Sequence, residues 1–363
     1  MFALGAFAFS ACAEKSSDQR GPMMTNVVPP SAPPPAAARY DVGGRPLLVR
    51  LVPEQATFMA GEPTFATLTF SAPEGGIEIE AAWMGRNKLG RPENYRIEFV
   101  DAKGVVLPVP EVGISFGGMS HVAKLGAGRE HRDRLLLPLW IGSLGPGRYT
   151  VRCTTKLPAR PDTGSDAGAA WQTVEVSVET SVEVIADDAT AIGALLEKLG
   201  ARAIGGDHDA ASEAMRKLAL VRDPRVVAEW IRVARVRDYE HVFAATMALG
   251  AWDDDRALAE IERVGATRAE DLDAQRYANE ELRVRSAAQL RVAAAQALSV
   301  SPHRRASAAL LAMKSDADAS VRLTVLHHAA KVADARTLLE SFAKDPDATV
   351  RNEAKRYLAE RRR

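Results

Sequence analysis

The chain has 363 residues, 47% of them hydrophobic, a length that predicts two or three domains with sizeable cores. Its 47 Lys and Arg balance its 47 Asp and Glu, and aromatic residues make up 6%, which argues against a nucleic-acid-binding protein. Two cysteines exclude a disulfide-dense scaffold and a four-cysteine zinc site.

The first residues have the composition of an export signal. An apolar block at residues 2–9 is followed by Ser10, Ala11 and Cys12 and then by polar residues. Phe9-Ser10-Ala11-Cys12 resembles the end of a bacterial lipoprotein signal, although leucine is usual where Phe9 stands. The resemblance implies that residues 1–11 are a signal-peptide remnant and that Cys12 is lipidated. No Lys or Arg precedes the apolar block, which a true start upstream of Met1 would explain.

Residues 12–40 are predicted to form a Pro/Ala-rich tether. Prolines cluster at residues 29–35, where they remove N–H donors and favour an extended polyproline II conformation. Such a segment acts as a semi-rigid spacer, and the alternative is a proline-rich ligand for a partner's aromatic groove. A tether directly after a lipid anchor predicts a location in the cell envelope, at the outer membrane facing the periplasm, or exported.

Residues 41–186 are predicted to form a β-sandwich. Short runs with strand character alternate with turn signals, at 47–52, 64–70, 76–80, 95–100, 105–108, 135–141, 148–153 and 172–178. Gly147-Arg-Tyr149 after a Pro-Gly turn resembles the late strand of immunoglobulin-like and fibronectin-like domains, which implies a tyrosine bonded to backbone at the corner. Residues 130–133 are expected to be a polar turn, and Cys153 a buried, unreactive side chain.

The sequence does not predict an enzyme. Gly113-x-Ser115-x-Gly117 matches the nucleophile-elbow pattern, but it lacks the strand–turn–helix context that this motif requires. Asp207-His208-Asp209 is expected to cap a helix, and the adjacent His327 and His328 point in different directions on a helix, so no metal site is predicted. No cofactor motif is present.

Residues 187–363 change to a helical period. Apolar stripes with spacing i, i+4 and i+8 begin at Ala210, His241, Leu290, Val321 and Val350. A second predicted helix lies between successive stripes, at 224–236, 254–264, 302–313 and 333–343. The long interval between His241 and Leu290 predicts an insertion near residues 265–282, on a binding face or as a longer helix.

Two of these stripes carry a family resemblance. Asp318-Ala-Ser-Val321-Arg322 and Asp347-Ala-Thr-Val350-Arg351 resemble the signature of HEAT repeats, in the short form seen in bilin-lyase-type proteins. The resemblance implies an α-helical solenoid, ladders of Asp and Arg between neighbouring repeats, and a concave surface that binds a partner, usually a protein. Nothing in the sequence marks a bilin site.

The candidate binding surface is a set of arginines on the helical half. They are Arg232, Arg235, Arg283, Arg285 and Arg291. From Asp188 onward the chain has 29 Lys and Arg against 27 Asp and Glu, a balance unsuited to a groove for nucleic acid. Ion-paired, solvated helix surfaces are the alternative interpretation of the same arginines.

The sequence therefore predicts a multidomain β plus α protein, an immunoglobulin-like β-sandwich followed by a HEAT-type solenoid. Its predicted function is a non-enzymatic, lipid-anchored scaffold that binds a protein partner. Two alternatives remain open. One is an accessory or lyase-like protein that binds a small molecule in the solenoid groove. The other is a sandwich that binds carbohydrate or inhibits a protease, for which an exposed Trp83 or Trp140 would be evidence, although both are expected in the core.

Overall fold

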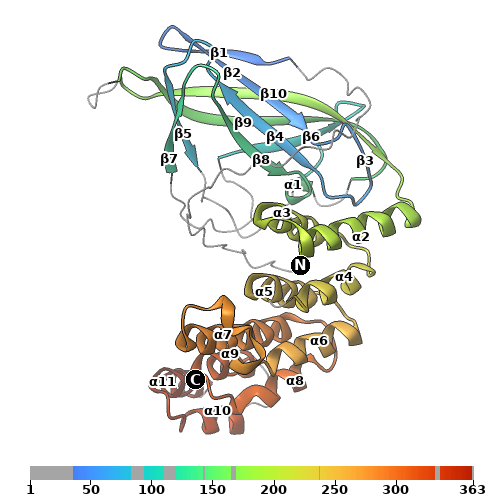
Figure 1. The fold of residues 1–363 in the computed structure, drawn as a ribbon, viewed down its shortest axis with the longest axis vertical. Coiled ribbons are helices and arrows are strands. Elements are labelled where there is room, and N and C mark those ends of the chain that lie inside the picture. Colours follow the sequence, from blue (N-terminus) through green and yellow to red (C-terminus); the bar gives the residue numbers. More distant parts are fainter. Residues whose placement is uncertain are drawn as a thin grey trace. The chain divides into compact units, whose positions relative to one another are not determined.

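The computed structural model describes residues 36–82, 94–109, 120–141, 144–164, 169–236, 238–331 and 336–361. The chain divides into two compact units, Met1–Asp188 and Ala189–Arg363. β-Sheets build the first unit and helices most of the second, which confirms the predicted succession of β and then α structure (Figure 1). The predicted signal remnant, Cys12 and most of the predicted tether lie outside the described residues.

Two sheets make up the first unit. Its strands are β1 (Ala38–Val42), β2 (Arg45–Pro53), β3 (Thr57–Met59), β4 (Phe65–Ser71), β5 (Ile77–Ala82), β6 (Arg96–Asp101), β7 (Ser120–Leu125), β8 (Glu130–Leu136), β9 (Gly147–Pro161) and β10 (Gln172–Ile185). One sheet has the order β1-β2-β4-β8, and the other has the order β3-β10-β9-β5-β7 with β6 also paired to β9. β3 runs parallel to β10, and the other pairings between these strands are antiparallel.

A common core joins the two sheets. β10 alternates between buried and exposed residues from Val174 to Val182, as a strand with one face on a core must. Leu68 and Phe70 of the four-stranded sheet belong to the same buried cluster as Phe99 and Val151 of the six-stranded sheet. The apolar residues that alternate in the sequence therefore meet across the two sheets.

The corner before β9 has the contact that the resemblance implied. The Tyr149 hydroxyl donates a hydrogen bond to the backbone carbonyl of Gly145 over 2.9 Å. Cys153, in the middle of β9, is fully buried, as predicted, and burial raises the pKa of its thiol to about 12. A thiol with that pKa is protonated and unreactive at neutral pH.

Three local predictions in the β region were wrong. Residues 105–108 are not a strand, since Val106 forms only an isolated bridge with Val100. The run at 135–141 is not one strand, because β8 ends at Leu136 and a short helix, α1 (Pro138–Ile141), follows. Proline has no N–H to donate to a ladder but fits the first turn of a helix, so Pro138 ends the strand. Residues 130–133 are not a turn but the first half of β8, where His131 and Asp133 alternate with more exposed neighbours.

Helices in two rows form the second unit. They are α2 (Ala189–Gly205), α3 (His208–Leu218), α4 (Val226–Ala234), α5 (Tyr239–Leu249), α6 (Asp255–Gly265), α7 (Glu280–Val300), α8 (Ala306–Ala312), α9 (Ala319–Ala329), α10 (Arg336–Phe342) and α11 (Ala348–Glu360). In one row α2, α4 and α6 contact each other in order, and in the other row α5, α7, α9 and α11 do so (Figure 1). Among the described residues, no helix combines the length and apolar character of a membrane span.

The predicted apolar stripes supply the contacts between helices. Leu290, Val321 and Val350 are buried, each with at most 1% of its surface exposed. Small residues let the helices approach closely, since a Cβ atom on Gly250 would lie 2.8 Å from the carbonyl oxygen of Ala297. Ala297 belongs to an alanine-rich stretch of α7 whose side chains are mostly buried. Three residues of the predicted apolar stripes, Ala210, His241 and Leu358, are only partly buried.

The insertion has two components. Residues 266–279 contain two short 3₁₀ turns, η1 (Ala269–Asp271) and η2 (Ala274–Arg276). The remaining extra residues lengthen α7, which begins ten residues before its first stripe position, Leu290, whereas α9 begins two residues before Val321. The insertion is therefore partly a loop and partly a longer helix.

Candidate functional site

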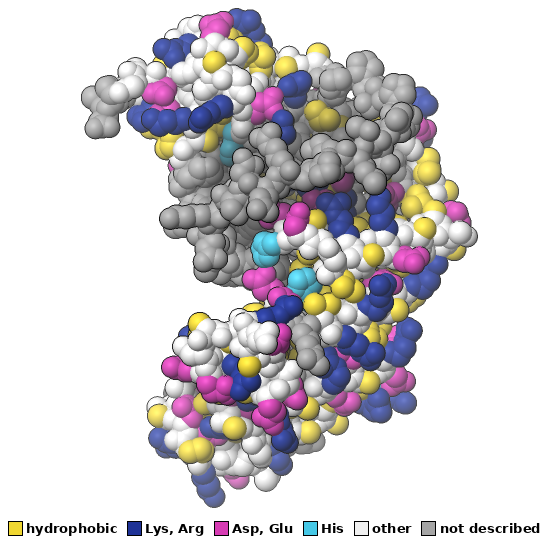
Figure 2. Space-filling model, in the orientation of Figure 1, with side chains coloured by type: hydrophobic (Ala, Val, Ile, Leu, Met, Phe, Trp, Pro, Cys, Tyr) yellow, Lys and Arg dark blue, Asp and Glu magenta, His cyan; other side chains and the backbone are white. Residues whose placement is uncertain are grey.

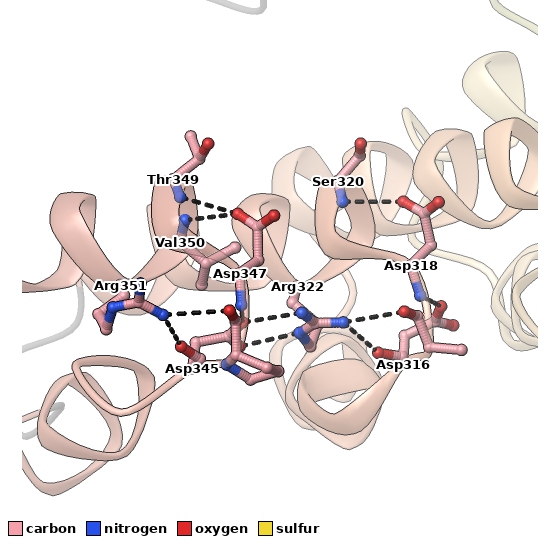
Figure 3. Close-up of polar contacts among 11 residues, drawn as sticks. Asp316, Asp318, Ser320, Arg322, Asp345, Asp347, Thr349, Val350 and Arg351 are labelled. Atoms are coloured by element: carbon pink, nitrogen blue, oxygen red, sulfur yellow. Dashed lines mark hydrogen bonds and ion pairs between the residues drawn. The ribbon is translucent and has the colours of Figure 1, made fainter.

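The aspartates of the predicted repeat signature cap helices. Asp318 precedes α9 and accepts a hydrogen bond from the backbone N–H of Ser320 over 2.8 Å. Asp347 precedes α11 and accepts from the N–H groups of Thr349 and Val350 over 2.8 and 3.1 Å (Figure 3). These carboxylates satisfy N–H groups that the first turn of a helix leaves without partners.

The arginine of the same signature links one helix pair to the next. Arg322 on α9 donates from Nε and Nη2 to both carboxylate oxygens of Asp345, over 2.8 and 2.7 Å. Its Nη1 donates to the backbone carbonyls of Asp316 and Ala317 in the turn before α9, over 2.8 and 3.0 Å (Figure 3). One guanidinium therefore holds both the turn before its own helix and the turn before α11.

The same arrangement occurs one repeat earlier. Arg291 on α7 donates from Nε and Nη2 to Asp316, over 2.9 and 3.1 Å, and from Nη1 to the carbonyl of Thr267 over 3.1 Å. We call the two bidentate pairs, Arg291–Asp316 and Arg322–Asp345, the ladder. At the end of the unit, Arg351 makes the corresponding bonds to the carbonyls of Asp345 and Pro346, over 2.5 and 3.1 Å.

The ladder is largely removed from water. The side chains of Arg322 and Asp345 are 11% and 6% exposed, and those of Arg291 and Asp316 are 16% and 12% exposed. The hydrogen bonds from Arg322 are the main reason why the pKa of Asp345 is lowered, and the pKa of Arg322 is raised in return. Both members of the pair are therefore charged across the physiological pH range.

The two aspartates that form the ladder were not among the residues predicted from the sequence. The ion pairs use Asp316 and Asp345, which stand two residues before the capping aspartates. Each also accepts a hydrogen bond from the N–H of its capping aspartate over 2.8 Å. A signal was present, because both stretches share the spacing Asp-x-Asp-Ala-Ser/Thr-Val-Arg.

A histidine links two helices in the first half of the helical unit, but it stands at the stripe position; Val242 occupies the position of the ladder arginines. The Nε2 atom of His241 on α5 lies 2.8 Å from the carbonyl oxygen of Ala203 on α2, and its Nδ1 atom lies 2.7 Å from Asp238. Asp238 caps α5 and also pairs with Arg276 of the insertion over 3.2 Å. Both ring nitrogens of His241 face acceptors, so the doubly protonated ring satisfies both contacts.

The contact between His241 and Asp238 shifts the pKa of both residues. The hydrogen bond to Asp238 is the main cause of a raised His241 pKa, with a smaller contribution in the same direction from the nearby charge of Glu240. The hydrogen bond to His241 is the main reason why the pKa of Asp238 is lowered from 3.8 to about 2. The contact between α5 and α2 therefore depends on pH.

The five candidate arginines fall into three groups. Arg232 pairs with Glu229 of its own helix over 2.7 Å, and Arg235 pairs with Glu260 of α6 over 3.3 Å. Arg283 pairs with Glu280 in the first turn of α7, near the exposed Arg285. Arg291 belongs to the ladder, because it follows Leu290 in the same register in which Arg322 follows Val321.

The remaining candidates are placed as follows. Asp207 caps α3, as predicted, by accepting from the N–H of Ala210. Trp140 is buried in the β core, as expected, with 3% of its surface exposed. Within the described ranges, no group of three His, Cys, Asp or Glu side chains could hold a metal ion. Trp83 and the Gly113-x-Ser115-x-Gly117 motif lie outside the described residues.

Comparisons with known proteins assign no family. No protein-family model matches the chain, and no curated protein sequence does. Among solved structures, the chain is similar to the native conformation of E. coli alpha-2-macroglobulin, with 11% identity and a TM-score of 0.18. That alignment covers 86% of this chain and 25% of the macroglobulin chain.

We predict that the ladder stabilises the helical unit. Arg322→Met keeps much of the side-chain volume but leaves Asp345 without its bidentate partner. We expect a loss of about 2–3 kcal/mol in the free energy of unfolding, between the values typical of exposed and of buried ion pairs. Urea unfolding followed by circular dichroism measures it. Arg356→Met, at an exposed pair on α11, is the control and should change little; equal effects of the two would contradict a special role for the ladder.

We also predict that the contribution of His241 to the stability of the helical unit falls as the pH rises through neutrality. Because the His241 pKa is higher in the folded than in the unfolded chain, its contribution is complete below the ordinary value of 6.5 and is lost as the pH rises through the folded value. Asp238 acts oppositely, and its contribution is lost as the pH falls toward about 2.

Unfolding free energies measured from about pH 5 to pH 9 test this prediction. His241→Gln should remove much of the decrease, whereas His327→Gln, at an exposed histidine on α9, should retain it. An unchanged pH profile in His241→Gln would show that other groups cause the dependence.

Proposed function

We propose that this chain is a binding protein of the cell envelope whose helical unit is a HEAT-type solenoid. The ladder carries the proposal, because its arginines recur 31 residues apart, at 291 and 322, and its aspartates 29 residues apart, at 316 and 345. A link repeated between successive helix pairs is the construction expected of a solenoid, in which each repeat contacts only its neighbours. Solenoids offer extended surfaces to partners, and we infer that the partner here is a protein.

The first unit is, in this proposal, an immunoglobulin-like β-sandwich. Two observations support it. Side chains of both sheets share one core, and the Tyr149–Gly145 contact resembles the tyrosine corner of such domains. In this arrangement the sandwich is a folded spacer between the membrane anchor and the solenoid.

The proposed location depends on the first forty residues. Phe9-Ser10-Ala11-Cys12 supports lipidation at Cys12, and the prolines at 29–35 support a tether that holds the folded units away from the lipid surface. Two or more acyl chains on one cysteine would anchor the protein stably. We propose the outer membrane facing the periplasm, or export, as the destination.

The proposed activity is binding rather than catalysis. Helix caps, ladder pairs and arginine–carboxylate pairs are frequent among the polar contacts of the described helical unit. Their chemistry is that of stability and of recognition by charge and hydrogen bonding.

If the protein is lipidated at Cys12, then Cys12 and not Cys153 is required for membrane anchoring. Expressed from its native gene in a Gram-negative host, the protein should enter the detergent phase of a Triton X-114 separation, and Cys12→Ala should leave it in the aqueous phase or unprocessed. Cys153→Ala is the matched control and should still enter the detergent phase. Detergent partitioning of Cys12→Ala would refute the anchor.

Partner binding can be tested by site-specific cross-linking in the producing cells. A photoreactive residue is placed at exposed positions of the helical unit, at Val284, Val300 or Lys355, and for comparison at Val105 and Val122 of the β unit. We expect adducts of discrete mass from at least one helical position. If every helical position stays free of adducts while the protein is folded and abundant, the binding function is wrong.

A further inference from the structure

A charge motif occurs twice in the helical unit and is separate from the ladder. Its pattern is Asp-x-Arg-x₃-Glu-x₂-Arg, and the copies begin at Asp223 and Asp254, 31 residues apart. The first copy contains Arg225, Glu229 and Arg232, and the second contains Arg256, Glu260 and Arg263. Each copy starts just before a helix of the same row, α4 or α6.

Within each copy the spacing places the charges on one helix face, since residues four and seven apart lie above one another. The acidic members hold the arginines. Asp223 pairs with Arg225 over 2.7 Å, and Asp254 pairs with Arg256 over 2.8 Å. Glu260 pairs with Arg263 over 2.7 Å, as Glu229 does with Arg232.

The two faces are joined into one surface. Arg235, at the end of α4, reaches Glu260 of α6, and Arg263 of α6 donates to the carbonyl of Ala234 over 3.0 Å. We call the resulting set the arginine row. It consists of Arg225, Arg232, Arg235, Arg256 and Arg263.

The arginines of the row are exposed, whereas the glutamates that pair with them are largely buried. The arginine side chains of the row are between 46% and 66% exposed, whereas Glu229 and Glu260 are 14% and 4% exposed. Lys and Arg side chains accordingly gather on the surface over α4 and α6 (Figure 2). A partner that meets this surface meets guanidinium groups, with the carboxylates beneath them.

The fold itself does not require the motif. In α8, which follows in the same part of the repeat, the corresponding positions of Glu and the second Arg are Ala309 and Ala312. In α10, Arg336 and Glu340 are kept, but Ala343 replaces the second arginine. Because α8 and α10 fold without the complete motif, we infer that the two complete copies serve recognition in addition to the contact between α4 and α6.

We propose that the arginine row binds an acidic segment of the protein partner. The proposal rests on the proposed function and names the surface and the chemistry. Glu229 and Glu260 hold the guanidinium groups in place, so little side-chain entropy is lost when a carboxylate binds the remaining N–H donors. Arginines seven residues apart on a helix are about 10 Å apart, which matches acidic residues at i and i+7 of a partner helix.

The balance of charge selects a protein rather than a polyanion. The five arginines face the four carboxylates of the motif, so the row has little net charge to attract a membrane surface or a nucleic acid from a distance. What it offers is a set of fixed guanidinium groups, whose N–H donors that are not used in these internal contacts can bind the carboxylates of a partner.

Fluorescence anisotropy of the full chain tests the row. The probe is a labelled, alanine-rich helical peptide of about 20 residues with Glu at positions seven apart, compared with the same peptide carrying Gln. We expect saturable binding of the Glu peptide at low salt, weakened about tenfold or more in the double variant R232Q/R263Q. Arg356→Gln is the matched control, because Arg356 is 50% exposed and pairs with Glu353 and Glu360 at the same spacings. Thermal melting of each variant is measured in parallel, and affinities are compared at a temperature at which all variants are folded, because Arg263 also contacts the buried Glu260.

Several outcomes would overturn the proposal. The proposal is wrong if the Glu peptide does not bind, if the Gln peptide binds as tightly as the Glu peptide, or if R232Q/R263Q binds the Glu peptide as tightly as the unchanged protein. Binding of anionic phospholipid vesicles through the same arginines, without competition by the Glu peptide, would make the row a lipid site and also refute it. If cross-links from Val284 or Lys355 persist in R232Q/R263Q, the partner binds without the arginine row, and only the row is rejected. If the unchanged protein gives no cross-link from any helical position, partner binding itself is rejected.

Discussion

The bidentate pair between Arg322 and Asp345 is the interaction on which the register between neighbouring helix pairs depends. Hydrophobic burial favours contact between helix pairs but has no direction, so apolar stripes alone would allow several registers. A buried ion pair does fix the register, because burying a charge costs free energy unless its oppositely charged partner is in place. A shift of one residue between neighbouring pairs would leave both groups of the ladder buried and unpaired.

The ladder also couples each turn to its helix. Arg322 donates to the carbonyls before α9, and Asp345 accepts from the N–H of Asp347 before α11. The backbone groups of both turns are therefore satisfied by the same side chains that join the repeats. The contact between His241 and the carbonyl of Ala203 depends on a proton, so the first half of the unit responds to pH in a way that the Arg–Asp pairs do not.

The arginine row uses the same residue types with a different result. In the ladder both charges are buried and the pair serves the fold. In the row the carboxylate is buried and the guanidinium remains exposed, so the pair positions a donor toward solvent. The side of the helix on which an arginine stands, rather than its chemistry, decides which role it has.

The sequence by itself determined the features that repeat within one element. These are the change from strands to helices, the cap at Asp207, and the buried stripe positions such as Val321, because each depends on neighbours a few residues away. Only the tertiary structure decided which aspartates form the ladder, that Arg291 belongs to it, and that His241 reaches Ala203. Those partners are 23 to 38 residues apart in the chain, and they meet only when whole helix pairs pack, a geometry that no local pattern specifies.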